Sequence, residues 1–140
     1  MHSTIRHDRR SGEFRDFVLA RIADARALIA ERIGQVGDHE TPVNDHQWNR
    51  IVDLELVPHP ANVQHPDTIE AEYGMEGGVL RFRARAAMAG YLLRRWNVDC
   101  TDDHSLKGGE YHLWLRNRQA LYGVTNLVLA PGYDEASKAW

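Results

Sequence analysis

Apolar side chains in the stretch 79–96, VLRFRARAAMAGYLLRRW, recur at the spacing of a helix that packs on two sides. At 3.6 residues per turn, one face carries Phe82, Ala86, Ala89, Leu93 and Trp96, and a second carries Leu80, Ala84, Ala87 and Tyr91. The arginines of the stretch fall on the seams between these faces. The pattern predicts a central helix over 79–96.

A second amphipathic pattern occupies 12–34. Ser11 can cap its first turn, and Gly34 and Gly37 can end it. We therefore expect a helix over 12–34, preceded by a flexible tail over 1–10. The apolar residues that step by three and four positions along this helix are Phe14, Phe17, Val18, Ile22, Ala25, Ile29 and Ile33.

The stretch 45–56 is compatible with a helix or a strand. The spacing of Trp48 and Ile51 favours a short helix, whereas the alternation around Leu54 and Leu56 is typical of a strand. We prefer the helix, because a single strand would need a partner that the sequence does not reveal.

The stretch 110–130 carries a similar ambiguity. Its apolar residues lie on one stripe of a helix, which predicts a fourth helix although Gly123 weakens it. A strand over 111–115 is the alternative. The residues on the stripe are Leu113, Ala120, Leu121, Val124, Leu127 and Val128.

These patterns together predict an all-α domain of about four helices around the central helix 79–96. The alternative is an α+β fold in which 51–57 and 111–115 form a small hairpin or sheet. The domain is expected to span 11–132 and to be followed by a short tail over 133–140.

Composition narrows the class of protein. The chain has 140 residues, of which 43% are hydrophobic and 26% charged, so we expect one globular domain. A net charge of −3 argues against nucleic acid or an acidic membrane as a partner. Cys100 is the single cysteine, the N-terminal stretch lacks the apolar segment of a signal peptide, and no apolar run could span a membrane. We expect a cytoplasmic protein.

The basic residues are biased toward arginine. Only Lys107 and Lys138 among the 17 basic residues are lysine. Arginine codons are GC-rich, so the bias suggests a high-GC source such as an actinobacterium or one of its phages.

One cluster has the residue types of a zinc site. Thiolate, imidazole and carboxylate are all zinc ligands, although the spacing here matches no standard zinc motif. A zinc site is therefore kept as an alternative to a protein without cofactors. The candidate ligands are Cys100, Asp102, Asp103, His104 and His112.

Two acidic clusters, 67–76 and 99–104, flank the central helix in sequence. Asp67 with Glu70 and Asp99 with Asp102 have the i, i+3 spacing that would place paired carboxylates on one helical face. Carboxylate pairs can hold Mg²⁺ against phosphate groups. This spacing keeps open a metal-dependent nucleotide hydrolase as the enzymatic alternative.

The arginine seams suggest a binding surface. Arginine and tryptophan are enriched at protein-binding hot spots, and they also bind nucleic acid. No catalytic motif is evident, so we expect a non-enzymatic interaction or accessory protein that binds a protein partner or associates as a homodimer. A nucleic-acid-binding protein is the third hypothesis. The candidate binding residues are Arg81, Arg85, Arg95, Trp96, Trp114, Arg116 and Arg118.

Overall fold

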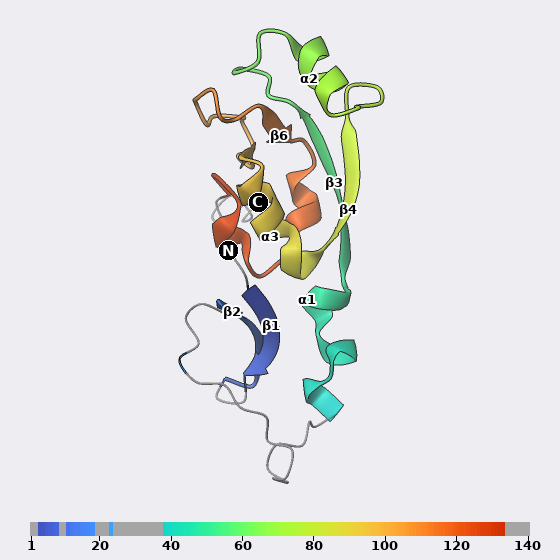
Figure 1. Cartoon of the computed structure of the whole chain (residues 1–140), viewed down its shortest axis with the longest axis vertical. Helices are drawn as coiled ribbons and strands as arrows, with labels where there is room; N and C mark the ends of the chain where they lie inside the picture. Colours follow the sequence, from blue (N-terminus) through green and yellow to red (C-terminus); the bar gives the residue numbers. More distant parts are fainter. Residues whose placement is uncertain (1–2, 9–10, 19–22, 24–37, 134–140) are drawn as a thin grey trace. The chain divides into compact units, whose positions relative to one another are not determined.

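The computed structural model divides the chain into two compact units, Met1–His46 and Gln47–Trp140, which are described separately (Figure 1). The described residues are 3–8, 11–18, 23 and 38–133. None of the helices within these ranges combines the length and the apolar character needed to cross a membrane. The predicted domain limits, 11 and 132, stay a prediction.

The first unit contains a hairpin of β1 (Ser3–Asp8) and β2 (Glu13–Val18). The strands pair antiparallel, from Ser3 opposite Val18 to Asp8 opposite Glu13. Gly12 takes a positive φ of 72° in the turn and donates its N–H to the carbonyl of Asp8. Two 3₁₀ turns follow later, η3 (Asp38–Glu40) and η4 (Pro42–Asn44).

This hairpin corrects the expected helix over 12–34 in its first part. Ser11 was the predicted helix cap, but its hydroxyl donates to the carbonyl of Asp8 inside the hairpin turn. β1 also lies in the stretch 1–10, for which a flexible tail was expected. The remainder of the predicted helix, 19–22 and 24–34, lies outside the described residues.

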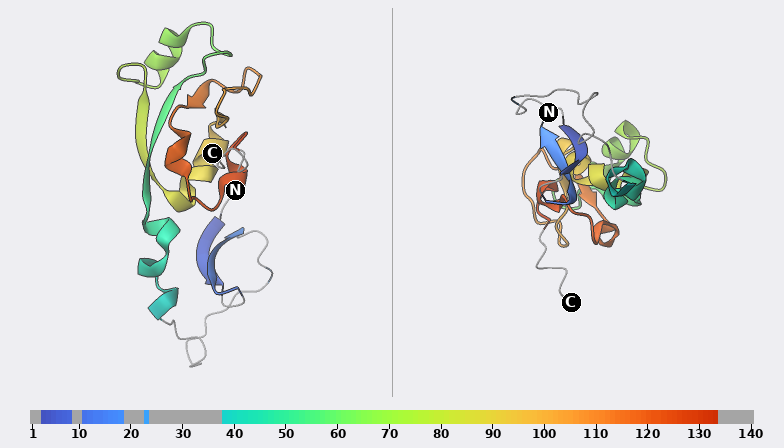
Figure 2. Two further views of the ribbon diagram at one scale, coloured as in Figure 1. Left: turned by 180° about the vertical axis from the view of Figure 1, so that it is seen from behind. Right: turned by 90° about the horizontal axis from the view of Figure 1, so that it is seen from below.

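The second unit is built on a four-stranded sheet in the order β4-β3-β6-β5. The strands are β3 (Ile51–Pro58), β4 (Leu80–Arg85), β5 (Val98–Asp99) and β6 (Leu113–Leu115). β3 pairs antiparallel with both β4 and β6, and β5 pairs parallel with β6. Figure 2 shows β3 and β4 from behind, side by side along their length.

The expected short helix over 45–56 is wrong beyond residue 49. A short helix, α1 (His46–Asn49), does precede β3, but Ile51–Pro58 is a strand. Val52, Leu54 and Leu56 are buried, and the residues between them face outward or are partly buried. The strand forms because β4 and β6 supply the two partners that were not evident from the sequence.

The expected central helix over 79–96 divides into a strand and a helix. Residues 80–85 form β4, and only α3 (Ala86–Arg95) is helical. Leu80, Phe82 and Ala84 also alternate with arginines, so this half fits a period of two once β3 lies beside it. In α3 the buried residues are Ala86, Ala87, Ala89, Gly90 and Leu93.

The expected fourth helix over 110–130 is replaced by β6 and two 3₁₀ turns, η5 (Arg118–Leu121) and η6 (Leu127–Leu129). Gly123 lies between the turns with a φ of 82°, a conformation that a continuous helix excludes. Burial of Leu121, Val124 and Leu127 agrees with the predicted stripe, but Val128 is 92% exposed.

The fold is therefore α+β, and the all-α expectation is wrong. The structure has the α+β alternative, with strands inside or overlapping both 51–57 and 111–115. α3 and the 3₁₀ turns contribute Leu93, Leu121 and Leu127 to a core shared with the buried side chains of the sheet. The helix α2 (Pro66–Glu72) lies in the connection between β3 and β4 and adds Ile69 to this core.

Candidate functional site

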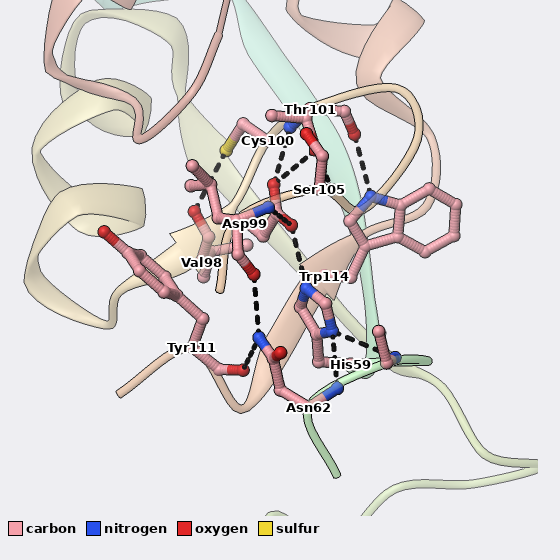
Figure 3. A network of polar contacts seen from close by, with 11 residues as sticks. His59, Asn62, Val98, Asp99, Cys100, Thr101, Ser105, Tyr111 and Trp114 are labelled. Carbon is pink, nitrogen blue, oxygen red and sulfur yellow. Dashed lines mark hydrogen bonds and ion pairs between the residues drawn. The ribbon is translucent and has the colours of Figure 1, made fainter. Parts of the chain in front are cut away.

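A network of polar contacts around a buried pair lies where the end of β3 meets the loop 100–112 (Figure 3). At its centre, His59 Nε2 lies 2.8 Å from Asp99 Oδ2, and both side chains are inaccessible to solvent. His59 directly follows β3, and Asp99 is the last residue of β5. Such a pair is stable in the interior only if its other polar atoms also have partners.

The carboxylate of Asp99 accepts three further hydrogen bonds. Its Oδ1 accepts the N–H of Thr101 at 2.9 Å and the hydroxyl of Thr101 at 2.7 Å. Its Oδ2 accepts the N–H of Leu106 at 3.1 Å in addition to the imidazole. Each oxygen thus receives two donors, which saturates the carboxylate and fixes the loop around it.

The surroundings of His59 assign its tautomer. The N–H groups of Ala61 and Asn62 both point at His59 Nδ1, at 3.2 and 3.1 Å. Nδ1 must therefore be the unprotonated acceptor, and Nε2 carries the proton that is donated to Asp99. The imidazole is neutral in this arrangement, and the carboxylate is the charged member of the pair.

Two more side chains donate hydrogen bonds to backbone carbonyls of the same loop. Asn62 Nδ2 donates to the carbonyls of Leu106 and Tyr111, at 2.8 and 3.2 Å. Trp114 Nε1 donates to the carbonyl of Thr101 at 2.8 Å. The polar groups of the network thus hydrogen-bond to one another. We assign to this network the role of holding the loop on the sheet.

The candidate zinc ligands are dispersed around this network. Asp102, Asp103 and His112 are exposed, whereas Cys100 is fully buried and His104 is partly buried. Within the ranges that the structure describes, no three of them place ligand atoms within 4.8 Å of one another. Zinc binding by this set stays a prediction.

The local chemistry of Cys100 is that of a core residue. Its thiol donates to the carbonyl of Val98 at 3.5 Å. Desolvation raises the pKa of the Cys100 thiol, the nearby Asp99 raises it further, and Arg118 opposes the rise. The thiolate that zinc binding or nucleophilic attack requires is therefore disfavoured. By contrast, a hydrogen bond from Ser105 lowers the pKa of the exposed Asp103 carboxyl.

The open face of the sheet carries opposite charges on neighbouring strands. Asp53 on β3 lies opposite Arg83 on β4, and their side chains form an ion pair at 3.3 Å. Glu55 lies opposite Arg81, but its carboxylate pairs with Arg116, whose Nε is 3.0 Å away. These exposed pairs complement the strands and contribute little to stability individually.

The remaining candidate binding residues fall into two groups. Arg85 and Arg118 act within the unit: Arg85 donates to the carbonyl of Trp48 at 2.8 Å and lies over its ring, and Arg118 lies over Tyr133. Arg95 and Trp96, at the end of α3, are exposed. The predicted arginine seams of the helix 79–96 therefore do not exist, because the arginines of this stretch belong to β4 and to the end of α3.

The most informative residues of this region were not singled out from the sequence. His59 and Asn62 belong to none of the candidate sites that the sequence predicts. Asp99 was assigned to an acidic metal cluster. A usable signal was the position of His59 between Pro58 and Pro60, at the end of an apolar strand, where a polar side chain needs a partner.

Comparison of the sequence with known proteins identifies its relatives. The sequence model described as "BrxR transcriptional regulator, C-terminal dimerization domain" matches residues 51–121. The DNA-binding transcriptional repressor CapW of Escherichia coli is 31% identical over 114 residues, which cover 81% of this chain and 36% of that protein. CapW of Pseudomonas aeruginosa is 32% identical over 109 residues, which cover 77% of this chain and 34% of that protein. The chain thus spans about a third of the length of these curated relatives.

This relationship corrects the functions expected from the sequence. The expected accessory protein that binds a protein partner is wrong, as is its suggested phage origin, and so is the nucleotide hydrolase, for which Asp99 would also have to leave its buried network. The suggested actinobacterial source stays a prediction. The expected homodimer agrees with the description of the family's domain. Because the match covers just over half of the 140 residues, the chain belongs to the BrxR transcriptional regulator family and carries that family's C-terminal dimerization domain.

Proposed function

We propose that this chain provides the dimerization module of a transcriptional regulator, in which two copies of the second unit associate. The observation that carries the proposal is the position of the family match. It covers 51–121, which lies inside the compact unit Gln47–Trp140 and includes all four strands of its sheet and α3. The matched stretch thus supplies most of the core of this unit, which Val124, Leu127 and Ala130 complete, and a dimerization module requires such a folded body.

Trp96 is the side chain that we assign to the interface. It lies inside the matched stretch, it is 41% exposed, and its neighbours Arg94 and Arg95 are exposed as well. Its ring packs edge-on against Phe82, with the ring centroids 5.3 Å apart, so the indole is already held in one orientation. A preorganised tryptophan flanked by arginines is typical of an interface hot spot.

Analytical ultracentrifugation of the full chain tests this assignment. The wild-type chain is expected to sediment as a dimer, and Trp96→Glu is expected to shift it toward the monomer with an unchanged far-UV circular dichroism spectrum. Val128→Glu is the matched control, because Val128 is 92% exposed but lies outside the family match. A monomeric wild-type chain, or equal dissociation by both variants, would contradict the proposal.

The second part of the proposal is repression through DNA. The curated relatives are DNA-binding transcriptional repressors, which weighs against our expectation that nucleic acid is not a partner. Four arginines of the second unit already have partners within the protein: Arg83, Arg85, Arg116 and Arg118. These intramolecular contacts support dimerization, rather than DNA binding, as the role of this unit. We infer that the dimer serves to place two DNA-binding elements on one operator.

Fluorescence anisotropy with labelled operator and scrambled duplexes tests this part. A repressor is expected to prefer the operator, and its affinity is expected to fall steeply with salt. Arg81→Gln and Arg95→Gln are expected to leave DNA affinity unchanged. A dimer that binds neither duplex would restrict the function of this chain to dimerization.

A further inference from the structure

In the first unit, a cluster of three potential metal ligands joins the β1–β2 hairpin to η3. His7 lies near the end of β1, and His39 and Glu40 are adjacent residues of η3. One ligand atom from each of the three, within the described residues, lies within 4.8 Å of the other two. These residues are separate from the candidate zinc ligands of the second unit.

The distances are close to those of a tetrahedral metal site. Glu40 Oε1 lies 3.7 Å from His7 Nδ1 and 3.7 Å from His39 Nε2. Ligands that bind a tetrahedral Zn²⁺ at its usual bond lengths are about 3.4 Å apart. Small side-chain rotations would therefore bring all three atoms into the first coordination sphere of one ion.

Burial supplies an independent observation. The side chains of His7 and Glu40 are only 7% and 11% exposed. His7 Nδ1 is buried, and among the described residues it has no hydrogen-bond partner, since its distance to Glu40 is too long for one. A buried imidazole nitrogen without a partner is unfavourable, and a metal ion would satisfy it.

The surroundings hold the imidazole of His7 in place. His7 lies opposite Phe14 in the hairpin, and the two rings meet edge to face with centroids 5.2 Å apart. The ring of His39 meets His7 in the same manner at 5.1 Å. The side chain of His39 is 73% exposed, which leaves one side of the cluster accessible to an ion and to water.

We propose that His7 Nδ1, His39 Nε2 and Glu40 Oε1 bind one Zn²⁺ ion. Two imidazoles and a carboxylate are a common donor set for zinc, and water completes the fourth position. The ion links two segments that are about 30 residues apart in sequence, so its binding stabilises the first unit.

Isothermal titration calorimetry of the full chain, freed of metal with a chelator, tests the site with Zn²⁺ as the titrant. One ion is expected to bind per chain. His39→Gln and Glu40→Gln are each expected to weaken binding at least tenfold, because loss of even an outer-shell partner costs about that much. His39 is exposed, so its replacement removes one ring contact of His7 but leaves the contact of His7 with Phe14 in place.

Two control variants make the result specific. His65→Gln removes an exposed histidine of the second unit, and the double variant Cys100→Ala, His104→Ala removes the predicted cluster. Both are expected to bind zinc as the wild type does. Absence of stoichiometric binding, or binding that survives His39→Gln and Glu40→Gln, would overturn the proposal, as would loss of zinc in the double variant alone.

Cobalt gives a second readout. Co²⁺ in a tetrahedral site absorbs visible light, and the wild-type chain is expected to develop this absorption and to lose it when Zn²⁺ is added. Zinc is also expected to raise the thermal midpoint of the wild type and not that of His39→Gln. Cobalt spectra typical of octahedral coordination would contradict the proposed geometry.

Discussion

His59 Nε2 donates its proton to Asp99 Oδ2 across 2.8 Å, in a place from which water is excluded. The pair joins the end of β3 to the end of β5, two strands that are separated by β6 in the sheet. The pair therefore holds the loop 100–112 against the sheet. This role leads to the first prediction.

Asp99→Asn is expected to lower the free energy of unfolding by about 2–4 kcal/mol. An amide nitrogen at the position of Oδ2 would face the N–H of His59, and rotating the amide would place it against the donors of Thr101. The other histidine tautomer gives no relief, because its Nδ1–H would face the N–H groups of Ala61 and Asn62. Urea denaturation measures the loss.

The control for this pair is Asp102→Asn. Asp102 is exposed, and its replacement is expected to change the free energy of unfolding by less than about 0.5 kcal/mol. Equal stability of Asp99→Asn and Asp102→Asn would show that the buried network does not support the fold.

Gly90→Ala is expected to destabilise the protein, although alanine is favoured over glycine inside a helix by about 1 kcal/mol. A Cβ atom at Gly90 would lie 2.4 Å from the carbonyl oxygen of Asn126, which belongs to the backbone next to η6. α3 and η6 would have to separate, and overpacking of this kind costs about 1–3 kcal/mol. Differential scanning calorimetry should show a lower midpoint.

Gly109→Ala is the matched control for crowding, since nothing lies within 4 Å of the added Cβ atom. Its midpoint is expected to stay within a degree or two of the wild type, by the usual scale for surface changes of this kind. A rise of the midpoint in Gly90→Ala would refute the close contact between α3 and Asn126.

Cys100 is expected to resist alkylation by iodoacetamide at pH 8 in the folded protein. Burial raises the pKa of the thiol, so at this pH the folded state holds less of the reactive thiolate than the unfolded chain does. Mass spectrometry before and after unfolding in guanidinium measures the difference. Because the charged form is disfavoured on folding, raising the pH through the ordinary thiol range is expected to reduce stability.

A relocated thiol provides the comparison. In the variant Cys100→Ala, Ser105→Cys the thiol lies at an exposed position of the loop and is expected to react rapidly without denaturant. If Cys100 in the folded wild type reacts as fast as this exposed thiol, the residue is not buried as described.

Asn117→Ala is expected to cost about 1–3 kcal/mol, because the Asn117 side chain continues the pairing of β3 beyond the end of β6. Its Oδ1 accepts the N–H of Glu55 at 2.8 Å, and its Nδ2 donates to the carbonyl of Asp53 at 2.9 Å. Hydrogen exchange of the Glu55 amide should accelerate. Gln119→Ala, at an exposed position nearby, should leave this exchange rate unchanged.

Some positions of the fold could be predicted because their patterns are local. Alternating burial at Val52, Leu54 and Leu56 was visible in the sequence, and so was the helical stripe that α3 retains at Ala86, Ala89 and Leu93. The candidate site was less accessible to prediction. His59 and Asp99 are 40 residues apart, and a polar pair of this kind has no periodicity that would reveal it.

By itself, the sequence determined which residues prefer the interior, since apolar side chains leave water whatever element contains them. Only the tertiary structure decided between helix and strand at Leu80–Arg85 and Ile51–Pro58, where both periods fit the same residues. β3 became a strand because β4 and β6 could pair with it on both sides, and those backbone hydrogen bonds form between residues far apart in the chain. Pairing across such distances is a property of the whole fold, which no local pattern encodes.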